Sequence, residues 1–160
     1  MKIYLLTHER ELHRPTNTGS LVPAACGGLV RRVVWQRRHP DPEIVGLIEA
    51  GDAALVYPVT EADQSGGDLP IFENFIVLDA TWQEARKMYN QSAYLKSACK
   101  VALIPALPSE YGLRRNQRPG GLCTAECVIE ILQAKGFESV AEQLRNDFRR
   151  FNLAKPGKKM

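Results

Sequence analysis

The chain has 160 residues and a mass of 17.9 kDa, which is enough for one domain with its own hydrophobic core. Hydrophobic residues make up 44% of the sequence and charged residues 24%, so the composition argues against a collagenous, coiled-coil or largely disordered chain. The net charge of +3 permits a nucleic-acid partner without requiring one.

Alternating strands and helices are predicted along the chain. In order, the expected elements are a strand at 2–6, a polar stretch at 7–19, a strand at 29–35, a helix at 42–50, a strand at 53–57, a loop at 61–70, a strand at 75–78, a helix at 82–89, a strand at 101–104, a loop at 105–121, and helices at 125–135 and 140–151. This order predicts a single α/β domain over residues 1–152, with a mostly parallel sheet and helices on both faces, followed by a basic tail at 153–160. Because ligands bind beyond the carboxyl ends of parallel strands, the segments that follow the strands at 2–6, 75–78 and 101–104 are the candidate site.

The first strand also bears on the location of the protein. Its apolar run, Ile3 to Leu6, is the longest near the start and ends at Thr7 and His8. That run is too short for a signal peptide or a membrane span. We therefore expect a cytoplasmic protein with no membrane partner.

Positive charge is concentrated toward the two ends of the sequence. Residues 1–50 carry a balance of +2, residues 51–100 a balance of −3 and residues 101–160 a balance of +4. If the two ends converge in the fold, they form a basic surface that suits a polyanion.

The four cysteines, at positions 26, 99, 123 and 127, include no C-x-x-C pair, and no pair of histidines has the spacing of a zinc site. This pattern favours reduced cysteines that pack as small apolar residues, and no metal is predicted.

The segment Asp79-Ala80-Thr81-Trp82 directly follows the strand at 75–78. One interpretation is that Asp79 or Thr81 caps the next helix. The other is that Asp79 faces a cleft, where burial raises its pKa and makes it a base or a hydrogen-bond acceptor. Trp82 either packs the junction between strand and helix or lines the pocket.

The loop at 105–121 combines Tyr111 with Arg114, Arg115 and Arg118 among several glycines and prolines. Arginine binds carboxylates or phosphates through two parallel hydrogen bonds, and tyrosine stacks on a base. A solvated surface loop explains the same composition. After this loop, Thr124 is the expected N-cap of a helix whose start is also a candidate anion site.

Polar residues also follow the first two strands. His8, Glu11 and Asn17 lie in the stretch after the first strand, and the second strand region holds Trp35 with four arginines at 31, 32, 37 and 38. Neighbouring residues of a strand point to opposite faces, so Arg31 and Arg32 do not share a patch. The arginines either contact phosphate or are merely solvated, and His8 is either a catalyst or an ordinary surface histidine.

Four segments in a fixed order resemble the DTW-domain family. They cover residues from about 5 to 132 and are His8-Glu9-Arg10-Glu11 with Thr16-Asn17-Thr18-Gly19, Asp79-Ala80-Thr81-Trp82, Ser109-Glu110-Tyr111-Gly112-Leu113-Arg114, and Leu122-Cys123-Thr124-Ala125-Glu126. A single four-residue motif is weak evidence, whereas four ordered segments are specific.

The resemblance implies a function and a fold. The family is similar to tRNA-uridine aminocarboxypropyltransferases, which transfer the 3-amino-3-carboxypropyl group of S-adenosylmethionine to N3 of a tRNA uridine and release methylthioadenosine. It implies S-adenosylmethionine as cofactor, tRNA as partner, and a SPOUT-like fold with a C-terminal knot, and it allows a homodimer. Two alternatives stay open: a SPOUT-like RNA methyltransferase that uses the same cofactor, and a non-catalytic RNA-binding module.

The resemblance also assigns expected roles to residues of this chain. The catalytic group is Asp79, Thr81 and Trp82, with Asp79 either as a base or as an anchor for the amino group of the methionine moiety. The cofactor-binding group is Leu103, Pro105, Leu107, Ser109, Tyr111, Leu113, Arg114, Leu122, Thr124 and Glu126. The RNA-binding group is His8, Arg10, Asn17, Arg37, Arg38, Arg115 and Arg118.

Three departures from the family pattern affect these expectations. The sequence starts at the first strand without the cysteine-rich, zinc-finger-like segment of many bacterial relatives, which again predicts no metal. Ala80 occupies a position where glycine is common, and its methyl group is expected to do no harm. The chain is short, so tRNA selection is expected to be looser or to depend on a second subunit.

Overall fold

The computed structural model describes residues 1–58, 69–103, 109–111 and 122–154. Five strands form one parallel sheet in the order β2-β1-β4-β3-β5, namely β1 (Lys2–Thr7), β2 (Val30–Val34), β3 (Ala54–Val56), β4 (Asn74–Asp79) and β5 (Cys99–Val101). The α-helices are α1 (Val22–Cys26), α2 (Pro42–Glu49), α3 (Trp82–Asn90), α4 (Ala93–Lys96), α5 (Thr124–Ala134) and α6 (Glu138–Ala154). Short 3-10 helices lie at Glu9–Glu11, Thr18–Leu21, Gly27–Leu29 and Leu69–Ile71. The predicted single α/β domain with a parallel sheet is confirmed.

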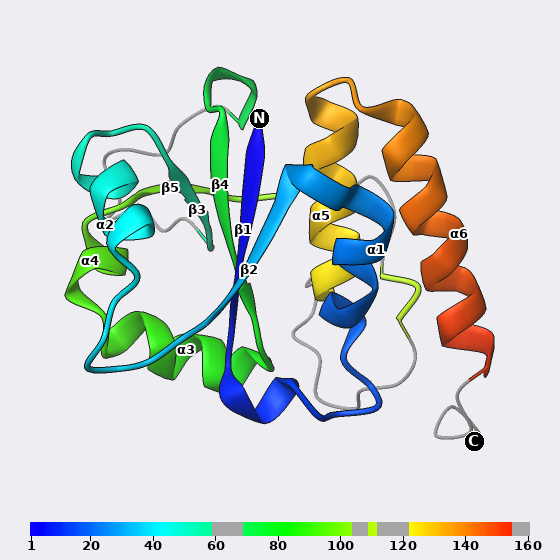
Figure 1. Cartoon of the computed structure of the whole chain (residues 1–160), viewed down its shortest axis with the longest axis horizontal. Helices are drawn as coiled ribbons and strands as arrows, with labels where there is room; N and C mark the ends of the chain where they lie inside the picture. Colours follow the sequence, from blue (N-terminus) through cyan, green and yellow to red (C-terminus); the bar gives the residue numbers. More distant parts are fainter. Residues whose placement is uncertain (59–68, 104–108, 112–121, 155–160) are drawn as a thin grey trace.

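Helices cover both faces of the sheet (Figure 1). Side chains alternate along β1, so Ile3 and Leu5 face one layer while Tyr4 and Leu6 face the other. The first layer contains α1, α5 and α6, and the second contains α2, α3 and α4. Strands buried on both faces read as continuous apolar runs, which is why the central strands were recognisable in the sequence.

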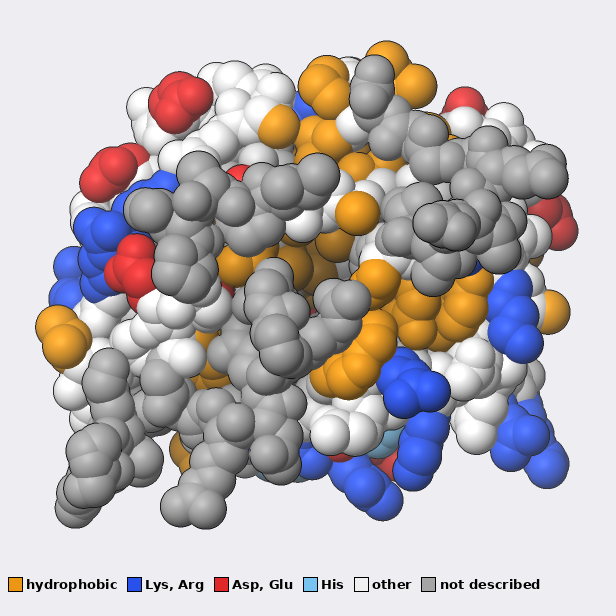
Figure 2. All heavy atoms as spheres, turned by 180° about the vertical axis from the view of Figure 1, so that it is seen from behind, with side chains coloured by type: hydrophobic (Ala, Val, Ile, Leu, Met, Phe, Trp, Pro, Cys, Tyr) orange, Lys and Arg blue, Asp and Glu red, His pale blue; other side chains and the backbone are white. Residues whose placement is uncertain are grey.

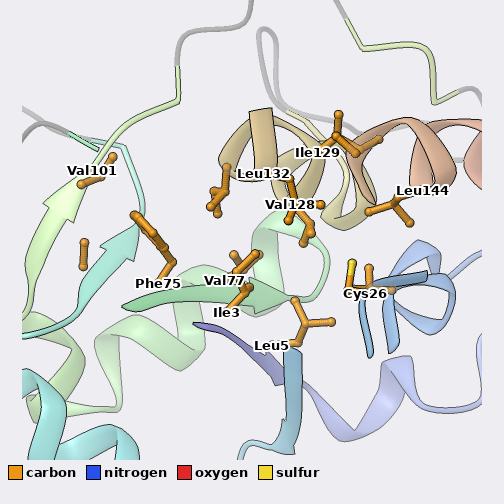
Figure 3. Close-up of a cluster of buried hydrophobic side chains, with 14 residues drawn as sticks. Ile3, Leu5, Cys26, Phe75, Val77, Val101, Val128, Ile129, Leu132 and Leu144 are labelled. Atoms are coloured by element: carbon orange, nitrogen blue, oxygen red, sulfur yellow. The ribbon is translucent and has the colours of Figure 1, made fainter. Parts of the chain in front are cut away.

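The layer on the α5 side holds the larger buried cluster (Figure 3). Phe75 and Val77 of β4 pack there with Val128 and Leu132 of α5. Cys26 of α1 lies in the same cluster, and burial raises the pKa of its thiol to about 11. This cysteine therefore serves as a small apolar residue, as the sequence suggested for all four.

The carboxyl ends of β1 and β4 meet at the centre of the sheet. These two strands are neighbours in register, and Thr7 pairs with Asp79. The chain leaves β1 toward α1 on one face and leaves β4 toward α3 on the other face. Such a reversal between adjacent strands opens the crevice in which α/β proteins bind ligands.

Several predicted boundaries are wrong by a few residues or more. The strand expected at 101–104 is β5 at Cys99–Val101, because β3 offers only three residues for pairing, so Leu103 lies beyond the strand. The last helix, expected at 140–151, begins at Glu138 and runs to Ala154. The short helices α1 and α4 were not predicted, since four or five residues are too few to show a helical period.

The C-terminal knot stays a prediction, because much of the connection from β5 to α5 lies outside the described residues. Within the described part of the chain, no helix combines the length and the hydropathy that a membrane span requires.

Candidate functional site

The carboxylate of Asp79 lies fully buried at the carboxyl end of β4 and accepts four hydrogen bonds. Its Oδ1 accepts from the amide of Asn17 and from the hydroxyl of Thr124, both at 2.8 Å. Its Oδ2 accepts from the hydroxyl of Thr7 at 3.0 Å and from a guanidinium nitrogen of Arg32 at 3.1 Å. Asp79 therefore joins β1, β2, the 16–19 segment and the start of α5.

Arg32 supplies the positive charge beside Asp79. Its guanidinium also donates to Asn17 Oδ1 at 2.8 Å and to Thr7 Oγ1 at 3.1 Å. The neighbouring Arg31 points to the other face of β2, where it pairs with Asp41 and Glu43 at the start of α2. The prediction that Arg31 and Arg32 do not share a patch is confirmed, and both engage carboxylates of the protein itself.

Gly19 packs directly against the Asp79 carboxylate. A Cβ atom built on Gly19 would lie 2.3 Å from Asp79 Oδ2 and 2.6 Å from both Oδ1 and Cγ. These separations are far below van der Waals contact, and the carboxylate is held by four partners. Only glycine therefore fits at position 19.

A second set of charges continues the network from Asn17. Asn17 donates to the buried Glu11 at 2.9 Å, and Glu11 pairs with Arg14. Arg14 then forms a two-point ion pair with Glu84 of α3, with N–O distances of 3.1 and 2.8 Å. Burial alone would raise the pKa of Glu84, but hydrogen bonds from Arg14 and from the Thr81 N–H lower it to about 2.

Thr81 caps α3, which confirms the capping interpretation for this residue and not for Asp79. Its hydroxyl accepts from the N–H of Glu84 at 3.2 Å, while the Glu84 carboxylate accepts from the N–H of Thr81 at 3.0 Å. This reciprocal pair satisfies two N–H groups that the first turn of a helix leaves open. Thr81 and Glu84 thereby fix α3 relative to the Asp79 network.

Trp82 packs with aromatic residues from other elements. Its ring lies 5.7 Å from that of Tyr57, which follows β3, and Tyr57 stacks on Tyr89 of α3 at 4.3 Å. The ammonium group of Lys100 lies 5.1 Å from the centre of the Tyr89 ring. Trp82 is half-buried here, which agrees with a packing role at the junction of strand and helix.

The segment 109–111 is tied to the start of α5 by Glu126. The Glu126 carboxylate accepts from the hydroxyl of Ser109, from the N–H of Glu110 at 2.7 Å and from the N–H of Cys123 at 3.1 Å. Cys123, not Thr124, is the N-cap of α5, so the prediction for Thr124 is wrong. Thr124 is the first helical residue, and its hydroxyl serves Asp79 instead.

Tyr111 is buried rather than open to stacking on a ligand. Its ring lies 6.2 Å from that of Phe148 in α6, and its hydroxyl donates to the backbone carbonyl of Thr16. The neighbouring Glu110 carbonyl accepts from Asn152 of α6 at 2.6 Å. The segment 109–111 is therefore clamped between α5, α6 and the residues that lead to Asn17.

Basic side chains lie on the same edge of the sheet as Asp79, further toward solvent. His8 is half-buried and stacks on Trp35 at 6.0 Å, while Arg10, Arg37 and Arg38 are exposed. They belong to the segments that follow β1 and β2. Figure 2 shows Lys and Arg side chains with a histidine along the lower edge of the molecule, where β1 and β4 end in Figure 1.

The structure thus separates the predicted site residues into groups. Asn17, expected at the RNA, is buried among Glu11, Asp79 and Arg32. Leu103 and Leu122 are half-buried. The remaining cofactor and RNA residues lie outside the described part of the chain, namely Pro105, Leu107, Leu113, Arg114, Arg115 and Arg118.

Thr7, Arg14 and Glu84 belong to the network but were not singled out from the sequence. Thr7 ends β1 beside a predicted site, which is the only sequence signal that marks it. Arg14 and Glu84 are separated by 70 residues, so their pairing depends on the fold. Among the described residues, no group of three or more His, Cys, Asp and Glu side chains is arranged to hold a metal ion.

Comparison with known proteins agrees with the arrangement of these segments. The model of the DTW domain family matches residues 1–154. The tRNA-uridine aminocarboxypropyltransferase 2 of Drosophila melanogaster is 27% identical over 143 residues, which cover 82% of this chain and 55% of that protein. The chain therefore spans about half the length of this curated relative. No solved structure matches. Four motif segments whose described residues meet at one edge of a parallel sheet, together with a match along nearly the whole chain, place this protein in the DTW domain family.

Proposed function

We propose that this protein transfers the 3-amino-3-carboxypropyl group of S-adenosylmethionine to N3 of a uridine in tRNA. The observation that carries the proposal is the convergence of the motif segments. Residues 7–19, 79–84, 109–111 and 122–126 are joined by hydrogen bonds at the carboxyl edge of β1 and β4. The name of the Drosophila relative supports the reaction class.

The proposed reaction is a displacement at carbon. A bond forms between uridine N3 and Cγ of the donor, while the bond between Cγ and the sulfonium sulfur breaks. Its electron pair stays on sulfur, which leaves as the neutral thioether of methylthioadenosine. The N3 proton passes to a base. Because the sulfonium carries three carbons, the choice of Cγ over the methyl group depends on how the donor is oriented.

The donor is proposed to bind beyond the end of β5, beside segments 109–111 and 122–126, which Glu126 joins to each other. Leu103 and Leu122 are half-buried apolar residues next to that region and suit the adenosine and thioether parts of the donor. Ser109 and Glu126 are engaged with each other, so in this fold they join segment 109–111 to the start of α5. Arg114 is proposed for the donor carboxylate on the basis of the family pattern alone.

The tRNA is proposed to bind along the basic edge. Arg10, Arg37 and Arg38 are exposed there and belong to segments adjacent to the Asp79 network. Contacts with phosphate release counterions, so the affinity for tRNA is expected to fall steeply as salt is added. Replacing Arg37 and Arg38 with alanine should weaken tRNA binding. It should also reduce the slope of the logarithm of the binding constant against the logarithm of the salt concentration by about two.

The experiment that tests the function is incubation with S-adenosylmethionine and total tRNA, followed by analysis of both products. Release of methylthioadenosine, with an aminocarboxypropyl-modified uridine in the digested tRNA, supports the proposal. Release of S-adenosylhomocysteine with a methylated nucleoside would indicate an RNA methyltransferase instead. Binding of tRNA with no turnover of the donor would indicate a non-catalytic RNA-binding module.

A further inference from the structure

The surroundings of Asp79 leave its carboxylate little room to act as a base. An ionised carboxylate offers about four acceptor positions on its two oxygens. All four are matched by donors from Asn17, Thr124, Thr7 and Arg32, at distances of 2.8 to 3.1 Å. The side chain is fully buried, so a uridine N3 proton reaches it only if one of these donors leaves.

The charges in the network favour the same conclusion. Arg32 is paired with Asp79 at 3.1 Å and keeps 23% of its side chain exposed. The guanidinium and the Thr7 hydroxyl both donate to Oδ2, while Asn17 and Thr124 both donate to Oδ1. Each oxygen of Asp79 therefore already serves two donors of the protein itself.

The same contacts show what Asp79 holds in place. Through Thr124 it fixes the first turn of α5, and the same turn carries Glu126, which holds Ser109 and Glu110. Through Asn17 it fixes the 16–19 segment, whose Thr18 hydroxyl accepts from the N–H of Ala125 at 3.1 Å. Both routes from Asp79 end at the segments that border the proposed donor site.

We propose that Asp79 is a positioning residue, with Arg32 as its counter-ion, and that it does not accept the uridine N3 proton. Its carboxylate joins the end of β1, the 16–19 segment and the start of α5, and so sets the shape of the donor site. This inference rests on the proposed function for its catalytic part. Its structural part, the coupling between positions 79 and 32, is independent of the reaction.

A double-mutant cycle tests the structural part, with thermal unfolding as the readout. Asp79→Asn and Arg32→Met each leave a buried polar partner unmatched and should lower the unfolding midpoint by roughly 5–10 °C. The double variant has no unpaired charge, so its unfolding midpoint should fall clearly less than the sum of the falls in the two single variants. Arg31→Met is the matched control, because Arg31 pairs with Asp41 on the opposite face and its effect should add to that of Asp79→Asn. Additivity of Asp79→Asn with Arg32→Met would overturn the proposal.

Kinetics separate a positioning residue from a base. If Asp79 positions the donor site, Asp79→Asn raises the KM for the donor by about tenfold. In the double variant Asp79→Asn/Arg32→Met, part of this increase in KM is reversed. The transfer activity that remains keeps the wild-type pH profile. A base would instead give a donor KM and unfolding midpoint like those of the wild type, a rate lower by about 10²–10⁴-fold, and loss of the acid limb of the pH profile. That second set of results would overturn the inference.

Thr124→Val keeps the test decisive if the Asp79 variant does not fold. It removes one donor to Asp79 and keeps the shape of the side chain. Positioning predicts a raised donor KM with an unmoved acid limb, whereas a basic Asp79 with one donor fewer would shift that limb to higher pH. If the wild type releases no methylthioadenosine, the proposed function fails. The coupling between positions 32 and 79 in thermal unfolding then still decides whether Asp79 and Arg32 form the structural pair that we propose.

Discussion

Gly19→Ala is the substitution to which the Asp79 network should respond most sharply. The new methyl carbon would lie 2.3 Å from Asp79 Oδ2, so either the carboxylate or the 16–19 segment must move by about an ångström. Asp79 cannot turn away without losing its hydrogen bonds to Arg32 and Thr7. Overpacking costs about 1–3 kcal/mol, and a lost hydrogen bond to a charged group costs about 1.5–3 kcal/mol. We therefore expect a loss of about 3 kcal/mol in the free energy of unfolding.

Thermal unfolding measured by calorimetry checks this number. For a domain of this size, about 3 kcal/mol corresponds to a fall of roughly 6–12 °C in the unfolding midpoint. Gly46→Ala is the matched control, because Gly46 lies in α2 and a Cβ atom added there would meet nothing within 4 Å. In a helix, alanine is favoured over glycine by about 1 kcal/mol, so the control should rise by roughly 2–4 °C. Equal midpoints for Gly19→Ala and the wild type would refute the close packing of Gly19 against Asp79.

Two further predictions concern the other carboxylates of the site. The pKa of Glu84 is lowered from its ordinary value of 4.5 to about 2 in the folded protein, so its ion pair with Arg14 stabilises the fold fully above pH 4.5 and is lost as the pH falls toward 2. Glu84→Gln should therefore reduce stability at pH 7 and flatten the fall in unfolding midpoint between pH 5 and pH 2, as followed by circular dichroism. Glu126→Gln should loosen Ser109 and Glu110 and weaken donor binding by about tenfold in calorimetric titration, and unchanged affinity would contradict the role given to Glu126.

The sheet was predictable because its central strands are buried on both faces. Residues 3–6 and 75–78 form apolar runs that no amphipathic helix would show, and both lie within observed strands. The start of α2 was also predictable from the sequence, since Asp41 caps the helix and Pro42 follows at the first helical position. Because the strand at 75–78 was recognised, Asp79 could also be placed at the carboxyl end of a central strand.

The network around Asp79 was not predictable, because its members come from distant parts of the sequence. Arg32 lies 47 residues from Asp79, and Thr124 lies 45 residues from it on the other side. Composition and periodicity describe neighbours along the chain and say nothing of such pairs. For this reason the sequence left Asp79 open between a base and an anchor, and it marked Thr124 as a cap although Cys123 holds that position.

The burial of Asn17 and Tyr111 has the same origin. Both are polar residues in segments rich in turn formers, which predicts exposure and contact with a ligand. In the fold, Asn17 is 2% exposed and donates to the buried Glu11, while Tyr111 is 6% exposed and donates to the backbone carbonyl of Thr16. Motif residues of this chain thus build the framework of the site at least as much as its contact surface.

The most direct test of the proposed function follows the fate of the donor carbons. Wild-type protein is incubated with tRNA and with S-adenosylmethionine that carries one label in the aminocarboxypropyl chain and a different label in the methyl group. We expect the chain label to enter uridine of the tRNA while the methyl label leaves with methylthioadenosine. Entry of the methyl label into the tRNA, or retention of both labels in unreacted donor, would contradict an aminocarboxypropyl transfer.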